Sequence, residues 1–182
     1  MTKIASQDLQ DLLQLEAIRR HHILDIPRDG SFDTLAELVR RFLDCKAAVV
    51  SILDRDGVFL MAHPGLDVDR IGAEPGLCAS AVAQDEPWIV EDAIVDPRTL
   101  ANPLVAGDLG LRFYAGIPLR TADGHNIGVL AALDFQPRKL SEEELATLKL
   151  IASVVVSMLE LRLAAWAKVA EARGGLKAAD QD

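Results

Sequence analysis

Two pairs of short apolar segments, each pair joined by a turn-forming stretch, limit the folds that this chain can adopt. The first pair is KAAVVSIL and VFLMAH, around the turn DRDG that contains Gly57. The second pair is RFYAGIPL and NIGVLAAL, around RTADGH. Short segments rich in β-branched residues and separated by such turns form antiparallel hairpins. The sequence therefore predicts an antiparallel sheet at the centre of the fold.

Helical patterns precede the predicted sheet. Residues 1–23 place leucines on one stripe and end in a run of arginines and histidines, so we expect an amphipathic N-terminal arm. Gly30 then interrupts the chain, and Ser31 is expected to cap a second helix. The apolar residues of that helix recur at helical spacing: Phe32, Leu35, Val39 and Phe42.

The longest regular pattern begins at Ser141, which can form a capping box with Glu144. Helical spacing continues to about Arg173, and Gly174 and Gly175 are expected to end the helix. One apolar stripe has coiled-coil spacing and contains Leu145, Leu148, Ala152, Val155, Leu159, Arg162, Trp166 and Val169. A second contains Ile151, Val154, Met158 and Leu161. One stripe can pack on the sheet and the other on a partner; the alternative is a single wide core face.

Composition and charge restrict the partners. The 182 residues carry a net charge of −9, and such an acidic chain lacks the clustered cations that bind nucleic acid or anionic membranes. The longest charge-free stretch, 150–159, is about half the length that spans a bilayer, and no signal peptide opens the sequence. We therefore expect a cytoplasmic protein that binds neither nucleic acid nor membranes.

Few residues of the sequence indicate a metal site or a reactive side chain. The histidines and the two cysteines lack metal-binding spacing, so no metal site is predicted. Cys45 is expected to be a packing residue. Cys78 follows Gly76 at the start of a short predicted helix, LCASAVAQ, whose N-terminus would favour a reactive thiolate. The alternative is that Cys78 is a small buried apolar residue.

The strand at 112–119 has two different faces. Alternation places Phe113, Ala115, Ile117 and Leu119 on one face, which is expected to meet the helices. It places Arg112, Tyr114, Gly116 and Pro118 on the other, which suits a concave site. The alternative is that Arg112 pairs with a carboxylate such as Asp92, Asp96 or Asp108 while Tyr114 packs. Residues 64–76, rich in glycine, proline and aspartate, are interpreted as a long loop and a candidate lid.

These segments, taken in order, resemble the GAF domain, a module that senses small molecules and chromophores. The resemblance runs from LDIPRDGSF through GLCASAV, PWIVEDAIVDPR and NPLVAGDLGLRFYAGIPL to RKLSEEELATLKLIA. It implies an α+β fold with a central antiparallel sheet, helices on its faces and helical arms at both termini. The corresponding division is a helical arm at 1–23, a GAF domain at 24–160 and a helix extension with a frayed tail at 161–182.

The resemblance also implies a pocket between the sheet and the segment 78–112. The residues expected to bind a ligand there are Cys78, Asp92, Asn102, Arg112 and Tyr114. Cyclic-nucleotide, bilin and haem signatures of the family are missing from this region, so the ligand and any cofactor stay unknown. Free methionine-(R)-sulfoxide reductases are the enzymes of the family, but their attacking cysteine would fall in DPRTLANP, which has none.

Three functions follow from this resemblance. The first is a stand-alone GAF sensor in bacterial signalling that binds an unidentified small molecule, forms a homodimer through its terminal helices and acts on a separate output protein. The second is a thiol-based reductase that uses Cys78. The third is a dimerisation scaffold whose pocket is filled by side chains. The sequence favours the sensor over the enzyme.

Overall fold

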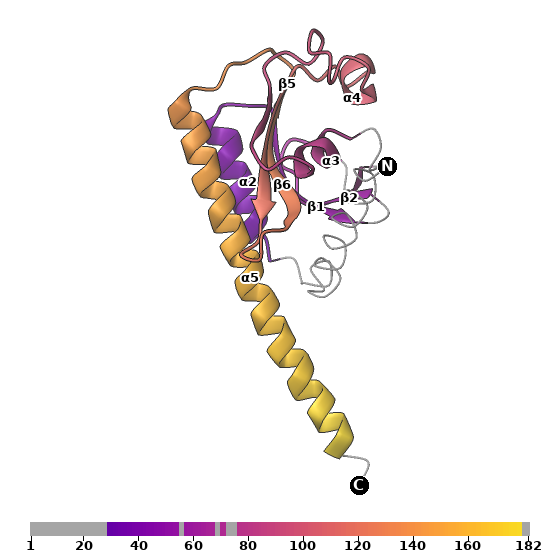
Figure 1. Cartoon of the computed structure of the whole chain (residues 1–182), viewed down its shortest axis with the longest axis vertical. Helices are drawn as coiled ribbons and strands as arrows, with labels where there is room; N and C mark the ends of the chain where they lie inside the picture. Colours follow the sequence, from indigo (N-terminus) through magenta and orange to yellow (C-terminus); the bar gives the residue numbers. More distant parts are fainter. Residues whose placement is uncertain (1–28, 55–56, 68–69, 72–75, 180–182) are drawn as a thin grey trace, which may run out of the picture.

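The computed structural model describes residues 29–54, 57–67, 70–71 and 76–179. Within these ranges the chain forms an antiparallel sheet with long helices on one face and short helices and loops on the other (Figure 1). The predicted α+β architecture is confirmed. The predicted N-terminal arm, 1–23, lies outside the described residues.

Both predicted hairpins are present in the sheet. β1 (Ala47–Asp54) pairs with β2 (Gly57–Ala62), and β5 (Phe113–Arg120) pairs with β6 (Asn126–Asp134). Because β1 also pairs with β6, the two hairpins join at the centre of the sheet. The short strand predicted at PWIV is β4 (Trp88–Val90), and the strand order is β3-β2-β1-β6-β5-β4.

Helix α2 (Ser31–Phe42) begins differently from the prediction. Its N-cap is Gly30, which has a φ of 78°, and Ser31 is already helical. The free backbone amide of Ser31 instead donates to Asp29 Oδ1 at 3.0 Å, so Asp29 supplies the acceptor that we expected from Ser31. Phe32 and Val39 are buried on the sheet, as predicted, but Phe42 is 45% exposed.

Helix α5 (Glu142–Ala179) starts with the predicted capping box. The backbone amide of Ser141 donates to Glu144 Oε2 at 2.7 Å, and the backbone amide of Glu144 donates to Ser141 Oγ at 3.1 Å. The residues of α5 buried by the sheet and α2 are Leu148, Ile151, Ala152, Val155, Leu159 and Leu163. Most of the first predicted stripe within the domain therefore packs inward. Val154 and Leu161 of the second stripe are exposed.

The end of α5 differs from the prediction. The helix continues through Gly174 and Gly175 to Ala179, so the predicted stop is wrong. Glycine lowers helix stability by about 1 kcal/mol relative to alanine but, unlike proline, leaves the hydrogen-bond ladder intact. By length and composition the stretch 142–169 could also cross a membrane, a property that core helices of globular proteins share.

Arg162 ties α5 to the first turn of α2. Its guanidinium donates to Asp29 Oδ2 and to Ser31 Oγ, and its Cζ lies 4.6 Å from the centre of the Phe32 ring. The hydrogen bond from Arg162 is the main cause that lowers the pKa of the Asp29 carboxyl below its ordinary range. This contact lies next to Leu163, the last buried residue of α5 among those whose side chains are described.

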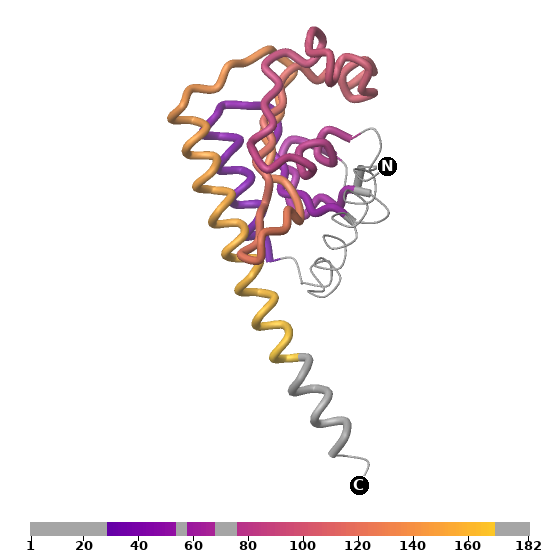
Figure 2. Tube along the Cα trace, in the orientation of Figure 1, coloured from indigo at the N-terminus to yellow at the C-terminus, as the bar shows by residue number. Residues whose placement is uncertain are grey.

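The opposite face of the sheet is covered by shorter elements. The chain runs from α3 (Leu77–Val82) through α4 (Pro103–Ala106) to β5 on the side away from α2 and α5 (Figure 2). The segment 64–76, predicted to be a loop, contains the two-residue strand β3 (Arg70–Ile71), which pairs with β2. Residues 68–69 and 72–75 of the candidate lid lie outside the described part of the chain.

Candidate functional site

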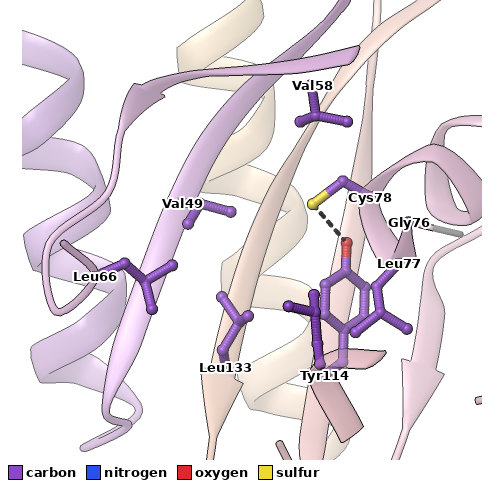
Figure 3. Close-up of a pocket in the computed structure, with 9 residues that line it drawn as sticks. Val49, Val58, Leu66, Gly76, Leu77, Cys78, Tyr114 and Leu133 are labelled. Atoms are coloured by element: carbon purple, nitrogen blue, oxygen red, sulfur yellow. Dashed lines mark hydrogen bonds between the residues drawn. The ribbon is translucent and has the colours of Figure 1, made fainter. Parts of the chain in front are cut away.

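A small, partly open cavity lies between the sheet and α3. Its walls come from β1, β2, β5, β6, α3, α4 and the start of the 64–76 segment (Figure 3). The lining residues are Val49, Val58, Leu66, Gly76, Leu77, Cys78, Leu104, Tyr114 and Leu133. The cavity offers about 20 Å³ to the centre of a water molecule, whereas a single water needs about 10–15 Å³. In this conformation it is therefore too small for a nucleotide or a tetrapyrrole.

Tyr114 and Cys78 meet at one end of the cavity. The Tyr114 hydroxyl donates to Cys78 Sγ at 3.5 Å, and both side chains are buried (Figure 3). Trp88 packs edge-on against the Tyr114 ring, with ring centres 5.5 Å apart. Gly116 leaves space for this ring, because a Cβ at position 116 would lie 2.7 Å from Tyr114 Cε1. Two of the five predicted site residues therefore meet in the cavity.

Burial controls the chemistry of these two groups. Burial raises the pKa of the Cys78 thiol, and the hydroxyls of Tyr114 and Ser51 lower that pKa by less. Burial also raises the pKa of Tyr114 well above its ordinary value. Both groups are therefore neutral near pH 7. Of the two possibilities given for Cys78, its burial and raised pKa favour the small buried apolar residue over a reactive thiolate.

Arg112 and Asp92 form an ion pair outside the cavity. Arg112 Nε and Nη2 donate to the two carboxylate oxygens of Asp92, each at 2.8 Å. The hydrogen bonds from Arg112 are the main cause that lowers the pKa of Asp92. This is the pairing that we gave as the alternative role of Arg112. Neither residue lines the cavity, so the structure does not bring them together with Tyr114 and Cys78.

Asn102 has an indirect relation to the cavity. Its side-chain oxygen accepts from the backbone amide of Leu104 at 2.9 Å and so caps α4, which begins with Pro103. Leu104 lines the cavity, but Asn102 does not. Asn102 is therefore placed to hold one wall of the cavity in position.

The apolar walls of the cavity were not predicted from the sequence. Val49 and Leu133 project from β1 and β6 on the face opposite the long helices, while their neighbours Ala48 and Ala132 belong to the helix-side core. Strand alternation in the two hairpins could have identified this set. Leu66 comes from a loop, and Leu77 and Leu104 come from helices of six and four residues, which are too short for a periodic pattern to show which side chains face the sheet.

The two cysteines lie on opposite faces of the sheet. Cys78 belongs to the core on the cavity side, and Cys45 is buried with α2 and α5, where its Sγ contacts the carbonyl oxygen of Ala47 at 3.3 Å. The sheet lies between them. Because the sequence has only these two cysteines, a mechanism in which one thiol resolves a disulfide with the other has no geometric basis within this chain.

An antiparallel sheet with long helices on one face and short helices and loops over the other is the arrangement of a known family. Residues 27–158 match the GAF domain, and the match covers most of the sequence. The chain belongs to the GAF domain family, as the resemblance implied.

Similar proteins connect this domain with signalling. The chain is 35% identical over 136 residues to a cyclic di-GMP phosphodiesterase of Pseudomonas aeruginosa. The alignment covers 74% of this chain and 23% of the phosphodiesterase, so the chain spans less than a quarter of that relative's length. It is thus a GAF domain of the kind that occurs in signalling proteins.

Solved structures show the same fold at lower identity. A domain of a protein assigned as a two-component sensor histidine kinase from Sinorhizobium meliloti superposes with a TM-score of 0.62 at 21% identity, over 77% of this chain and 96% of that one. The free methionine-R-sulfoxide reductase from Neisseria meningitidis, in complex with its substrate, also has a TM-score of 0.62 at 21% identity, over 80% of this chain and 86% of that one.

Proposed function

We propose that this domain is a sensory module that binds a small molecule in the cavity beside Tyr114 and passes the binding event to α5. The observation that carries the proposal is the position of β5. Tyr114 on one face of this strand lines the cavity, while Phe113 and Ala115 on the other face belong to the core formed with α2 and α5. A shift of β5 on ligand binding would therefore act directly on the helix layer.

The ligand must favour an open arrangement of the cavity. With room for little more than one water, the described state is the closed one, and a ligand changes a conformational equilibrium only through its different affinities for the two states. Leu66 and Leu77 adjoin the cavity from the loop side and from α3. Outward movement of these two side chains would enlarge the site without disturbing the centre of the sheet.

The output surface that we propose is the exposed side of α5. Leu150, Val154 and Leu161 follow one another at spacings of four and seven residues, and they are 68%, 46% and 75% exposed. This is the spacing of a coiled-coil seam, so we propose that two copies of the chain pair along this stripe. Exposed apolar side chains at such spacing favour an interaction surface over scattered surface residues. The relative that degrades cyclic di-GMP makes an enzyme of cyclic-dinucleotide turnover a candidate output partner.

Native mass spectrometry of the purified chain tests both halves of the proposal, because it reports the dimer mass and any retained molecule together. We expect a dimer, and we expect Leu161→Glu to convert it to a monomer by placing charges in the seam. Ala167→Glu is the matched control, since Ala167 is exposed on a different side of α5. A wild-type monomer at micromolar concentration would exclude pairing along this stripe.

The small cavity also favours a second candidate, a dimerisation scaffold that binds no ligand. The two functions differ in one measurable property, the response of α5 to occupation of the cavity. For the sensor, hydrogen exchange of α5 backbone amides changes when a retained molecule is removed or added back. For the scaffold, no molecule is retained and the exchange of α5 is the same in every preparation.

A further inference from the structure

We propose that two copies of the chain pair with their α5 helices antiparallel, so that Glu143 of each copy lies opposite Lys168 of the other. The inference rests on the proposed function, because it names the orientation and the register of the pairing along α5. Its grounds are the spacing of the residues on the exposed side of α5, the hydrogen bonds of their hydroxyl groups and the charges at the two ends.

The exposed side of α5 carries a continuous row of residues at alternating spacings of four and three, which we call the outer seam. This is the spacing of a coiled coil, and the seam extends for about 38 Å along the helix axis. All members between its two ends are uncharged, although 26% of the residues of the chain are charged. All are exposed except Thr147, which is half-buried. The members are Glu143, Thr147, Leu150, Val154, Ser157, Leu161, Ala164 and Lys168.

The hydroxyl groups of the outer seam already have partners within the helix. The Thr147 hydroxyl donates to the backbone carbonyl oxygen of Glu143 at 2.9 Å. The Ser157 hydroxyl donates to the backbone carbonyl oxygen of Ser153, also at 2.9 Å. Burying a hydroxyl without an acceptor is unfavourable, but these hydroxyls keep their acceptors when another helix covers them. The whole seam can therefore be buried against an apolar helix face.

The charges at the two ends of the outer seam favour a second copy of the chain as the occupant, in the antiparallel orientation. A two-fold axis through the middle of the seam places Glu143 opposite Lys168 at both ends of the pair. A parallel pair places Glu143 opposite Glu143 and Lys168 opposite Lys168. Like charges that face each other across an interface are unfavourable, whereas opposite charges attract. The seam is therefore self-complementary, as a two-fold interface between identical chains requires.

The side chains between the ends fit the same register. Leu150 lies opposite Leu161 of the second copy, on each side of the two-fold axis. Val154 lies opposite the small Ser157, and Thr147 lies opposite the small Ala164. A shift by one heptad in one direction places Lys168 opposite Leu150, and a shift in the other direction places Glu143 opposite Leu161. Both shifts set a charge against an apolar side chain, so the ends of the seam select one register.

This pairing brings the helix faces of two domains together. Helix α2 lies beside α5 on the same face of the sheet, and its residues Leu38 and Phe42 are 51% and 45% exposed (Figure 1). They add apolar surface next to the outer seam. Beyond Leu163 the helix α5 extends past its own domain (Figure 1). In the antiparallel pair the two extensions therefore leave the dimer in opposite directions.

Charge reversal at the ends of the outer seam tests the orientation. In the antiparallel pair, Glu143→Lys or Lys168→Glu alone sets like charges opposite each other at both ends. We expect each variant to raise the dimer dissociation constant about tenfold at low ionic strength. The double variant restores both contacts, so its dissociation constant should lie within about twofold of the wild-type value. Sedimentation equilibrium over a range of concentrations measures all four proteins.

A parallel pair predicts a different result for the same variants. There each single change only replaces one like-charged pair by another, so unchanged dissociation constants would overturn the proposal. The two single variants change the net charge in opposite directions, so a general charge effect does not weaken both. Glu142→Lys is the matched control, because Glu142 is exposed in the same first turn but lies outside the outer seam. An equal rise for Glu142→Lys would also overturn the proposal.

Disulfide trapping tests the register. Under mild oxidation, a mixture of Leu150→Cys and Leu161→Cys chains should give a linked dimer, and neither variant alone should do so. The wild type is the background control, because Cys45 and Cys78 are both buried. Linkage of Leu150→Cys chains to one another would demonstrate a parallel pair and overturn the proposal.

The outcomes separate this proposal from the proposed function. If the chain is a dimer that links Leu150→Cys to itself, pairing along α5 stands and the antiparallel orientation fails. If the chain is a monomer, the pairing itself fails, and the outer seam is then open to another occupant such as the N-terminal segment 1–28. None of these measurements depends on occupation of the cavity.

Discussion

The two faces of the sheet differ in how they are covered. One face packs against two long helices, α2 and α5, and its core contains fully buried residues such as Leu43, Phe113 and Leu130. The other is covered by a six-residue helix, a four-residue helix and loops, and the apolar cavity lies there. Long amphipathic helices bury a continuous stripe, whereas short elements leave gaps between them. The helix face therefore packs as a continuous core, whereas the core on the loop face contains a cavity.

The sharpest test of this contrast compares two leucines on β6. Leu130 points into the helix-side core and Leu133 lines the cavity, so the same substitution probes each face. We expect Leu130→Ala to lower the free energy of unfolding by about 4 kcal/mol and Leu133→Ala by about 2 kcal/mol. The smaller value reflects a site that already borders empty space. Urea unfolding followed by circular dichroism measures both, and equal losses would contradict the difference between the faces.

The next largest effect is expected at Gly116, on the cavity face. A methyl group there would lie 2.7 Å from Tyr114 Cε1 and 2.9 Å from Ala81 Cβ, so Gly116→Ala must push the Tyr114 ring away. We expect a loss of about 1–3 kcal/mol and an altered near-ultraviolet circular dichroism spectrum of Tyr114 and Trp88. Ala81→Gly removes the clash with Ala81 Cβ, though not those with Tyr114, and should restore part of the loss. Additive losses in the double variant would show that Ala81 is not the obstacle.

Much of the difference between the two faces could be predicted from the sequence, because it depends on residues that are close together in the chain. Alternation along β5 correctly assigned Phe113, Ala115, Ile117 and Leu119 to the helix side and Tyr114 to the other face. Hairpin turns and the capping box are likewise set by neighbouring residues. These features depend on a few consecutive positions, and tertiary contacts reinforce them.

The alternation of side chains along β5 does not extend to Arg112. β5 begins at Phe113, so Arg112 precedes the strand and its side chain does not have to follow the pleat. Its carbonyl oxygen accepts from the backbone amide of Ala93, which brings the Asp92 carboxylate within reach of its guanidinium. This contact joins segments twenty residues apart, and no periodic pattern encodes it. The cavity walls from Leu66, Leu77 and Leu104 were missed for the same reason.

The Arg112–Asp92 pair allows a test by pH. The pKa of Asp92 is lowered by the hydrogen bonds from Arg112, so the pair stabilises the folded chain above the ordinary aspartate pKa, about 3.9, and this contribution is lost as the pH falls below it. Asp92→Asn should therefore lower Tm slightly at neutral pH and leave it unchanged in acid. Scanning calorimetry across this range measures the effect.

The smallest effect is expected in the alkylation of the two thiols, one on each face of the sheet. This comparison needs no substitution. Both are buried, and burial raises the pKa of each, so alkylation of the native chain should be slow even at mildly alkaline pH. Cys78 reacts only when the cavity face opens, and Cys45 only when the core beneath α2 and α5 opens. Local opening of short elements costs less free energy than opening of the main core. Alkylation followed by peptide mass spectrometry should therefore find Cys78 modified before Cys45. Equal rates for both thiols would mean that the two faces open together, and the cavity face would then have no independent mobility with which to admit a ligand.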